Sequence, residues 1–341
     1  MKLAIAAFTQ RGLALANRLR AGLGNNCKVT VPLRLADGDA DVMESLHGWT
    51  KTAFSECEGL ILIGAAGIAV RAIAPFVKDK FTDPAVVSVD EAGRFVVSLL
   101  SGHVGGANRL AETVAKLCGG IAVCSSATDV NGIFAVDEWA SLHGLSIDGR
   151  SAAKEVSATL LEGRQVSFRS DFPVIGTLPA GFTTSKRELG VYITAQNSFP
   201  FTKTLRLVPK ILDVGIGCKR DTPAYAIAAA LGHAFDANHL STQAILALHT
   251  IDVKKEEPGL MSFCKKHGWP LHTYTADELS ALDGEFTKSD FVQHTVGVDN
   301  VCERSACMAG GTLIQKKYSE DGVTVAIAQQ SYVVSFEGDK E

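Results

Sequence analysis

Several classes of protein are excluded by features that this sequence lacks. No apolar run reaches the ~18 residues of a membrane-spanning helix. The longest apolar stretch, residues 59–70, contains three glycines and ends at Arg71, so no membrane span is expected. The 33 basic and 37 acidic residues give a net charge of −4, which offers no support for binding to nucleic acid or to a membrane surface. Residues 1–10 have the length of one buried strand rather than the pattern of a cleavable signal, so we expect a cytoplasmic protein.

The usual signatures of metal, redox and nucleotide chemistry are also missing. The eight cysteines form no C-x-x-C pair and no cluster with zinc-ligand spacing, so we expect reduced thiols and no metal site. No G-x-x-x-x-G-K-[ST], H-E-x-x-H or G-x-S-x-G motif occurs. Gly215 and Gly217 do not complete G-x-G-x-x-G, because Arg220 stands at the place of the third glycine. A nucleotide-binding α/β enzyme is therefore disfavoured and kept as an alternative. Cys218 follows this glycine pair, where a thiolate can be stabilised, although a structural role is favoured.

Strands that alternate with helices predict an α/β protein of several domains. At 341 residues the chain is too long for one ordinary core. Residues 1–130, with a continuous apolar strand at residues 59–63, predict a doubly wound N-terminal domain. Residues 131–205 have shorter strand-like segments and predict a small α+β middle domain. Residues 206–341 predict a second, parallel and doubly wound α/β domain at the C-terminus. Two strands are expected to open this third unit, at residues 204–208 and 211–215.

The most informative stretch of the sequence is residues 85–117. Two β-branched runs flank a turn at Asp90 and Glu91 and predict a hairpin, and helical spacing begins at Arg109. Between the hairpin and the helix lies a loop, residues 101–108, that contains three glycines and His103. Glycines let a backbone approach a ligand closely, and a helix N-terminus presents unpaired N–H groups. The pattern predicts a binding loop whose histidine serves as a general base at neutral pH. The alternative is a plain strand-to-helix connection with a surface histidine.

Two further glycine segments are followed by basic residues. Residues 64–67 precede Arg71, and residues 215–218 precede Lys219 and Arg220. Backbone N–H groups beside cations suit carboxylates or other anionic groups. The alternative is a solvated basic face at the start of a helix.

Two blocks of motifs that are unrelated in pattern occur together in this chain. The first block consists of GLILIGAAGIAVRAIAP, DPAVVSVDEAGRFVVSLLSGHVGGANRLAETVA and SSATDV. The second consists of VGIGCKRDTPA, IDVKKEEPGL and FVQHTVGVDNVCERSA, followed by Lys316 and VTVAIA. In both blocks, and over nearly the whole chain, the sequence resembles the cobalamin-biosynthesis family CbiG, the cobalt-precorrin-5A hydrolases. Ser125 and Ser126 stand where threonines are usual, and Asp290 where a proline is common; neither difference removes a titratable group.

The resemblance implies a reaction. The family substrate is a cobalt-containing, ring-contracted tetrapyrrole with a δ-lactone and several acetate and propionate side chains. The enzyme opens the lactone with water, which gives cobalt-precorrin-5B and acetaldehyde. The cobalt arrives inside the substrate, so no cofactor and no metal held by the protein are expected. The expected partner is this tetrapyrrole, with a homodimer and transient contacts with other cobalamin-pathway enzymes as further expectations. Neither nucleic acid nor a membrane is an expected partner.

The resemblance and the residues together suggest a site. His103 is the expected base, or the acid that protonates the leaving alkoxide, and Asp90 or Glu91 is expected to orient it. The backbone N–H groups of Gly105 and Gly106 are the expected oxyanion donors. The alternative is that His103 only binds a substrate carboxylate or caps the helix. Further candidates for acid–base chemistry include Asp137, Glu257 and Glu303. The residues expected to bind substrate are Gly64, Gly67, Arg71, Ser101, Gly102, Gly105, Gly106, Asn108, Gly215, Gly217, Lys219, Arg220 and Glu303.

The three glycine segments, residues 64–67, 101–108 and 215–220, are expected to face one cleft between domains. A non-catalytic carrier of a corrinoid intermediate is the main alternative function, because the C-terminal unit resembles a small stand-alone protein of the corrin pathway.

Overall fold

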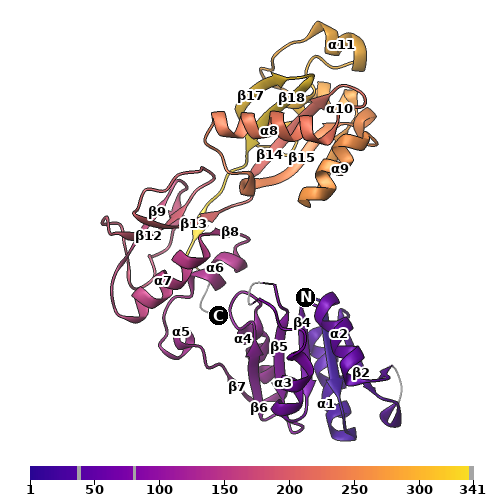
Figure 1. Cartoon of the computed structure of the whole chain (residues 1–341), viewed down its shortest axis with the longest axis vertical. Helices are drawn as coiled ribbons and strands as arrows, with labels where there is room; N and C mark the ends of the chain where they lie inside the picture. The colour runs from indigo at the N-terminus through magenta and orange to yellow at the C-terminus, as the bar shows by residue number, and fades with distance from the viewer. Residues whose placement is uncertain (37–39, 80–81, 338–341) are drawn as a thin grey trace. The chain divides into compact units, whose positions relative to one another are not determined.

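The computed structural model describes residues 1–36, 40–79 and 82–337, and the chain divides into two compact units, Met1–Ser141 and Leu142–Glu341 (Figure 1). Each unit is built on its own sheets. The expected class, a multidomain α/β protein, is confirmed. The residue limits expected for three domains stay a prediction. Within the described residues, none of the helices combines the length and the apolar character needed to span a bilayer.

The N-terminal unit is a seven-stranded sheet in the order β3-β2-β1-β4-β5-β6-β7. Neighbouring strands are parallel except β5 and β6, which form the expected antiparallel hairpin. Helices α1 and α4 pack on one face of the sheet and α2 and α3 on the other, so the unit is doubly wound as expected. The elements are β1 (Leu3–Ala7), α1 (Gln10–Leu23), β2 (Cys27–Pro32), β3 (Asp41–Met43), α2 (Leu46–Glu56), β4 (Gly59–Ile63), α3 (Ala66–Ile73), β5 (Ala85–Val89), β6 (Phe95–Leu100), α4 (Ala107–Cys118), β7 (Ile121–Val123), α5 (Ala127–Val130) and α6 (Val136–Leu142).

The central strands of this sheet form because their residues are apolar throughout. Every residue of β1, β4 and β5 is buried, as parallel strands require when helices cover both faces. Thr9 caps α1, because its hydroxyl accepts a hydrogen bond from the N–H of Gly12 at 3.1 Å. Threonine is a preferred residue at this position, so the start of α1 follows from local side-chain chemistry.

The middle part of the chain forms a five-stranded sheet in the order β11-β9-β12-β13-β8. Only β8 runs antiparallel to its neighbour, and α7 packs against β9, β12 and β13. Residues 203–208 pair with β12 and β8, so the expectation that this strand opens the C-terminal domain is wrong. A strand's neighbours along the chain do not fix its partners in the sheet. The elements are β8 (Ser146–Asp148), α7 (Arg150–Leu161), β9 (Val166–Ser170), β10 (Val174–Ile175), β11 (Phe182–Thr183), β12 (Leu189–Ile193) and β13 (Lys203–Val208), with β10 pairing β19 (Val334–Ser335).

The C-terminal sheet has five strands in the order β16-β15-β14-β18-β17. Strands β14, β15 and β16 are parallel as expected, whereas β18 and β17 run antiparallel, so the expectation of a wholly parallel sheet is wrong for its last two strands. The expected glycine loop at residues 215–218 is also wrong, because β14 continues through Cys218. The elements are β14 (Leu212–Cys218), α8 (Ala224–Ala237), β15 (Ile245–Ile251), α9 (Pro258–His267), β16 (Leu271–Tyr274), α10 (Ala276–Ala281), α11 (Asp290–Val296), α12 (Cys302–Cys307), β17 (Thr312–Glu320) and β18 (Val323–Gln329).

Gly215 explains why a glycine stands inside this buried strand. Helix α12 lies directly against β14, and a Cβ added at Gly215 would lie 1.8 Å from the carbonyl oxygen of Cys302. No side chain fits in that space. The glycine that suggested a loop in the sequence is needed for the close packing of a helix on a strand.

We expect Gly215→Ala to destabilise the protein by about 1 to 3 kcal/mol, because the added methyl group must push α12 away from the sheet. Gly232→Ala is the matched control: no heavy atom lies within 4 Å of the Cβ position at Gly232 in α8, and alanine suits a helix better than glycine. Urea unfolding followed by circular dichroism measures both. An unfolding midpoint for Gly215→Ala equal to that of the wild type would contradict the packing argument.

Candidate functional site

The loop between β6 and α4 is closed by its own backbone. The N–H of Ala107 donates to the carbonyl of Ser101 at 3.0 Å, and the N–H of Gly106 donates to the carbonyl of His103 at 2.9 Å. A Cβ at Gly105 would lie 2.3 Å from the Cβ of Ser101, so only glycine fits there. The loop is therefore a compact support that fixes the backbone of His103.

Two buried polar residues, Asn108 and Ser101, complete this support. The backbone N–H of Asn108 donates to the carbonyl of Gly102 at 3.0 Å, and its side chain lies over Gly102, where a Cβ would be 2.8 Å from Oδ1 of Asn108. Ser101 has a φ of 58°, a strained value for serine, and is buried. Within the described part of the chain its hydroxyl finds no hydrogen-bond partner. Strain and an unsatisfied polar group in one loop are features of functional sites.

The His103 side chain lies between a hydroxyl group and two carboxylates. Its Nε2 atom is 3.1 Å from the Oγ1 atom of Thr128. Its Nδ1 atom is 3.6 Å from Oε2 of Glu138 and 4.0 Å from Oδ1 of Asp137. The side chains of His103, Glu138 and Asp137 are only 18%, 22% and 12% exposed, so water screens these interactions weakly.

This arrangement gives the two ring nitrogens different roles. The carboxylates favour the tautomer with the proton on Nδ1, which leaves the lone pair of Nε2 facing the Thr128 hydroxyl. The order carboxylate, imidazole, hydroxyl is the order found in hydrolytic triads.

Asp90 and Glu91 lie at the opposite edge of the sheet from His103. Strand β6 runs back along β5, and Val86 near the start of β5 pairs with Leu100 at the end of β6. At roughly 3.4 Å per residue, the length of β5 separates the hairpin turn from the His103 loop by on the order of 15 Å. The expectation that Asp90 or Glu91 orients His103 is therefore not met.

Both acidic residues instead have local partners. Asp90 accepts hydrogen bonds from the N–H groups of Ala92 at 2.8 Å and Phe95 at 2.6 Å and so closes the hairpin turn. Partial burial would raise the pKa of Asp90, but the N–H groups of Phe95 and Ala92 outweigh it and lower that pKa below its usual value. Glu91 accepts a hydrogen bond from the Thr9 hydroxyl at 2.7 Å.

Gly64, Gly67 and Arg71 also lie away from His103, on the edge that carries the hairpin turn. The N–H of Gly64 donates to the carbonyl of Val89 at 2.8 Å, at the carboxyl end of β5, and Arg71 donates to the carbonyl of Gly67 at 3.3 Å. The first two glycine segments thus occupy opposite edges of one sheet. The expectation that all three segments face a single cleft is wrong.

The predicted C-terminal residues separate into two groups. Gly217, Lys219 and Arg220 line a cavity of about 710 Å³ at the carboxyl ends of β14 and β15. Gly215 is covered by α12, as described above. Glu303 is fully buried and accepts hydrogen bonds from the backbone N–H groups of Thr287 and Lys317, so its carboxylate holds a loop and a strand in place rather than facing the cavity.

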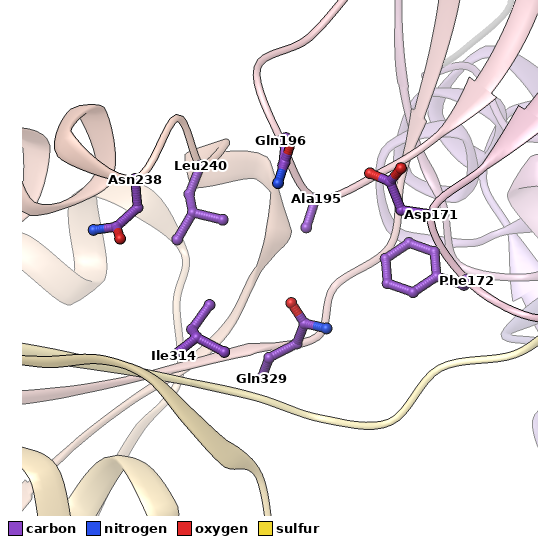
Figure 2. A pocket seen from close by; sticks show the side chains of 8 residues that line it. All are labelled: Asp171, Phe172, Ala195, Gln196, Asn238, Leu240, Ile314 and Gln329. Carbon is purple, nitrogen blue, oxygen red and sulfur yellow. The ribbon is translucent and has the colours of Figure 1, made fainter.

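Figure 2 shows a second, smaller cavity of about 340 Å³ in the C-terminal unit. Its lining is neutral or acidic and contains none of the predicted residues. The carboxylate of Asp171 accepts hydrogen bonds from the hydroxyls of Tyr192 and Thr194, and Asn238 donates to Gln315. A cavity without a cation does not suit a polycarboxylate.

Sequence reasoning missed two members of the His103 cluster, Thr128 and Glu138. Asp137 was singled out as titratable, and the motif SSATDV contains Thr128, but the fold alone brings α5 and α6 to the β6–α4 loop. A helix that begins with two adjacent acidic residues, Asp137 and Glu138, was the available signal.

The fold and the cluster define a multidomain α/β protein with a candidate hydrolytic site in its N-terminal unit. The chain belongs to the CbiG family of cobalamin synthesis proteins. Models of the family's N-terminal domain, central region and C-terminal domain match residues 48–129, 134–209 and 212–328. The resemblance seen in the motifs is thereby confirmed.

Whole-chain relatives agree with this family. The chain is 36% identical over 340 residues to a cobalt-precorrin-5A hydrolase of Salmonella typhimurium, covering 95% of this chain and 97% of that one. It is 29% identical over 364 residues to a cobalt-precorrin-5A hydrolase of Priestia megaterium, covering 96% and 95%. A crystal structure of a cobalamin biosynthesis protein G homologue from Sulfolobus solfataricus covers 96% of each chain with a TM-score of 0.41 and 17% identity.

We expect Cys218 to react slowly with iodoacetamide at pH 7.5. Burial raises the pKa of its thiol, and the nearby Lys254 only partly offsets that effect, so little reactive thiolate is present. Peptide mass spectrometry after timed alkylation gives the rate, with urea-unfolded protein as the control. Alkylation of the folded protein faster than of the unfolded protein would show a stabilised thiolate and contradict the structural role.

Proposed function

We propose that this chain hydrolyses cobalt-precorrin-5A, opening its δ-lactone with water to give cobalt-precorrin-5B and acetaldehyde. The observation that carries the proposal is the placement of His103, with carboxylates at Nδ1 and a hydroxyl at Nε2. The curated relatives named above, which this chain covers almost end to end, support the same reaction.

In the proposed mechanism Nε2 of His103 takes a proton from the attacking water. The water adds to the lactone carbonyl, the ring C–O bond breaks, and the imidazolium returns its proton to the leaving alkoxide. Glu138 and Asp137 stabilise the imidazolium during this step. Thr128 holds the ring orientation through Nε2 before the reaction, and the attacking water then takes the place of its hydroxyl at Nε2. The carbon that carries the freed hydroxyl then loses the hydroxyl proton and forms the aldehyde C=O bond. Its carbon–carbon bond to the macrocycle breaks, the electron pair passes to the macrocycle, which takes up a proton, and acetaldehyde leaves.

The developing oxyanion needs hydrogen-bond donors. The N–H of Gly106 already donates to the carbonyl of His103, so it is not available as first expected. The N–H of Gly105 makes no hydrogen bond to the described residues and is the remaining one of the two expected donors.

Other expectations accompany the reaction as part of the proposal. The cobalt belongs to the substrate, so the protein needs no cofactor of its own. A cytoplasmic location, a homodimer and transient contacts with other cobalamin-pathway enzymes fit an enzyme that receives and passes on a pathway intermediate. A non-catalytic carrier is not favoured, because the matched relatives are named as hydrolases.

We expect His103→Ala to lower kcat about 10²- to 10⁴-fold, or roughly 3 to 5 kcal/mol, because the base is lost. The assay follows acetaldehyde release at saturating cobalt-precorrin-5A and several pH values. The pH profile of kcat should also lose its acid limb. A raised KM with unchanged kcat would show that His103 only binds substrate. An ester of substrate on Thr128, detected by mass spectrometry, would contradict direct attack by water.

We expect Asp137→Asn combined with Glu138→Gln to lower kcat by about 10- to 100-fold, because the imidazolium loses both neutralising charges. Glu91→Gln is the matched control, since it makes the same chemical change at the opposite edge of the sheet. Equal kcat values for the double variant and the control would remove the two carboxylates from the mechanism.

A further inference from the structure

The cavity lined by Gly217, Lys219 and Arg220 lies wholly within the C-terminal unit and is remote in sequence from His103. Strands β14 and β15 both end at it, and the carboxyl ends of parallel strands are where open α/β sheets bind ligands. Its volume of about 710 Å³ falls within the range of sites for sizeable organic ligands. The His103 mechanism makes no use of it.

Part of the cavity lining is apolar and exposed. Helix α11 contributes Phe291, Val292 and Val296, and the segment after β15 contributes Val253. Phe291 is 76% exposed and Val253 is 66% exposed, and no residue of α11 is fully buried. Exposed apolar side chains that line one cavity indicate a binding surface, and an aromatic ring suits a flat ligand.

The lining also carries four cations: Lys219, Arg220, Lys254 and Lys317. One carboxylate, that of Glu257, lines the cavity with them; it pairs with Lys254 at 2.9 Å and interacts at longer range with Arg220. In the described ranges no carboxylate lies within ion-pair distance of Lys219, Arg220 or Lys317. Four cations against one carboxylate around one cavity favour a ligand with several negative groups.

The loop that carries Lys219 and Arg220 is held in place before any ligand binds. Glu257 accepts a hydrogen bond from the N–H of Asp221 at 2.7 Å, and the Thr222 hydroxyl donates to the carbonyl of Lys219 at 2.8 Å. The stem of Lys219 packs over Gly322 in the turn between β17 and β18, where a Cβ would lie 2.9 Å from the Lys219 Cδ atom. Preorganised cations lose little conformational entropy on binding.

We propose that this cavity binds the macrocycle of a polycarboxylated tetrapyrrole. The ring lies against the apolar wall of α11, and its peripheral carboxylates reach Lys219, Arg220 and Lys317. The identity of the ligand rests on the proposed function, whereas the combination of a flat apolar face with several carboxylates follows from the cavity itself. The C-terminal unit thereby supplies affinity for the substrate, separately from the histidine cluster.

The test uses the full chain and uroporphyrin, a flat tetrapyrrole with eight carboxylates that has no lactone to hydrolyse. Titration followed by porphyrin absorbance and fluorescence gives Kd. The double variant Lys219→Ala, Arg220→Ala should weaken binding about 10-fold or more and reduce the salt dependence of Kd. The matched control is Lys265→Ala, Lys266→Ala, which removes two exposed cations of α9 outside the cavity. Equal Kd values for the two double variants overturn the proposal.

The apolar wall is tested independently of charge. Phe291→Ala should weaken uroporphyrin binding several-fold, and Tyr225→Ala, which removes a similarly exposed ring of α8 outside the cavity, should not. Unchanged binding by Phe291→Ala would show that this ring does not contact the ligand.

His103→Ala separates this inference from the proposed function, because this variant should bind uroporphyrin like the wild type. If the wild type does not bind uroporphyrin but His103→Ala loses turnover, only the cavity proposal is contradicted. If the cavity variants weaken uroporphyrin binding but His103→Ala keeps full turnover, only the catalytic proposal is contradicted.

Discussion

The direction of one strand decides what each edge of the N-terminal sheet carries. Strands β3, β2, β1, β4 and β5 run in one direction, whereas β6 turns back along β5 and β7 runs parallel to β6. This reversal moves the start of α4, and with it the glycine loop of His103, to the edge where β4 and β5 begin. The carboxyl edge, where doubly wound folds usually bind ligands, keeps Gly64, Arg71 and the hairpin turn. A single antiparallel pairing therefore separates two groups of residues that the sequence places within 40 positions of each other.

The same reversal explains why the partners of His103 come from farther along the chain. At the edge where β6 ends, the available side chains are those of α5 and α6, which follow β7. They supply Thr128, Asp137 and Glu138. Burial of Asp137 makes its position well defined, and the adjacent Glu138 comes to the same ring nitrogen. The cluster is thus a consequence of topology, and its signal in the local sequence is limited to the two acidic residues at the start of α6.

The sequence was sufficient where local physics decides the outcome. The apolar run Gly59–Ile63, the cap at Thr9 and the hairpin around Asp90 were all predictable from side-chain chemistry. It was insufficient where contacts between segments far apart in the sequence determine the structure. Gly215 resembles a loop glycine, yet its role is to admit the carbonyl of Cys302, which lies 87 residues later (302 − 215). The strand at Lys203–Val208 joins the middle sheet through hydrogen bonds to β12 and β8 that no local pattern encodes. The motifs identified the family, but they assigned His103 partners at the wrong edge.

The charges around His103 also constrain how a polycarboxylate can be bound. In the proposed mechanism two carboxylates lie beside Nδ1 of the base, and the same two charges repel the acetate and propionate groups of a tetrapyrrole. A cluster with this charge does not favour the binding of an anionic substrate. Under the proposal, affinity for the substrate carboxylates requires cations elsewhere in the chain that have no paired carboxylate. Lys219, Arg220 and Lys317 meet this condition, because in the described structure they form no ion pair with the protein. Binding at the cavity and proton transfer at His103 are thus proposed for different residues, each within one folded unit, and substitutions in one unit at a time can separate the two roles.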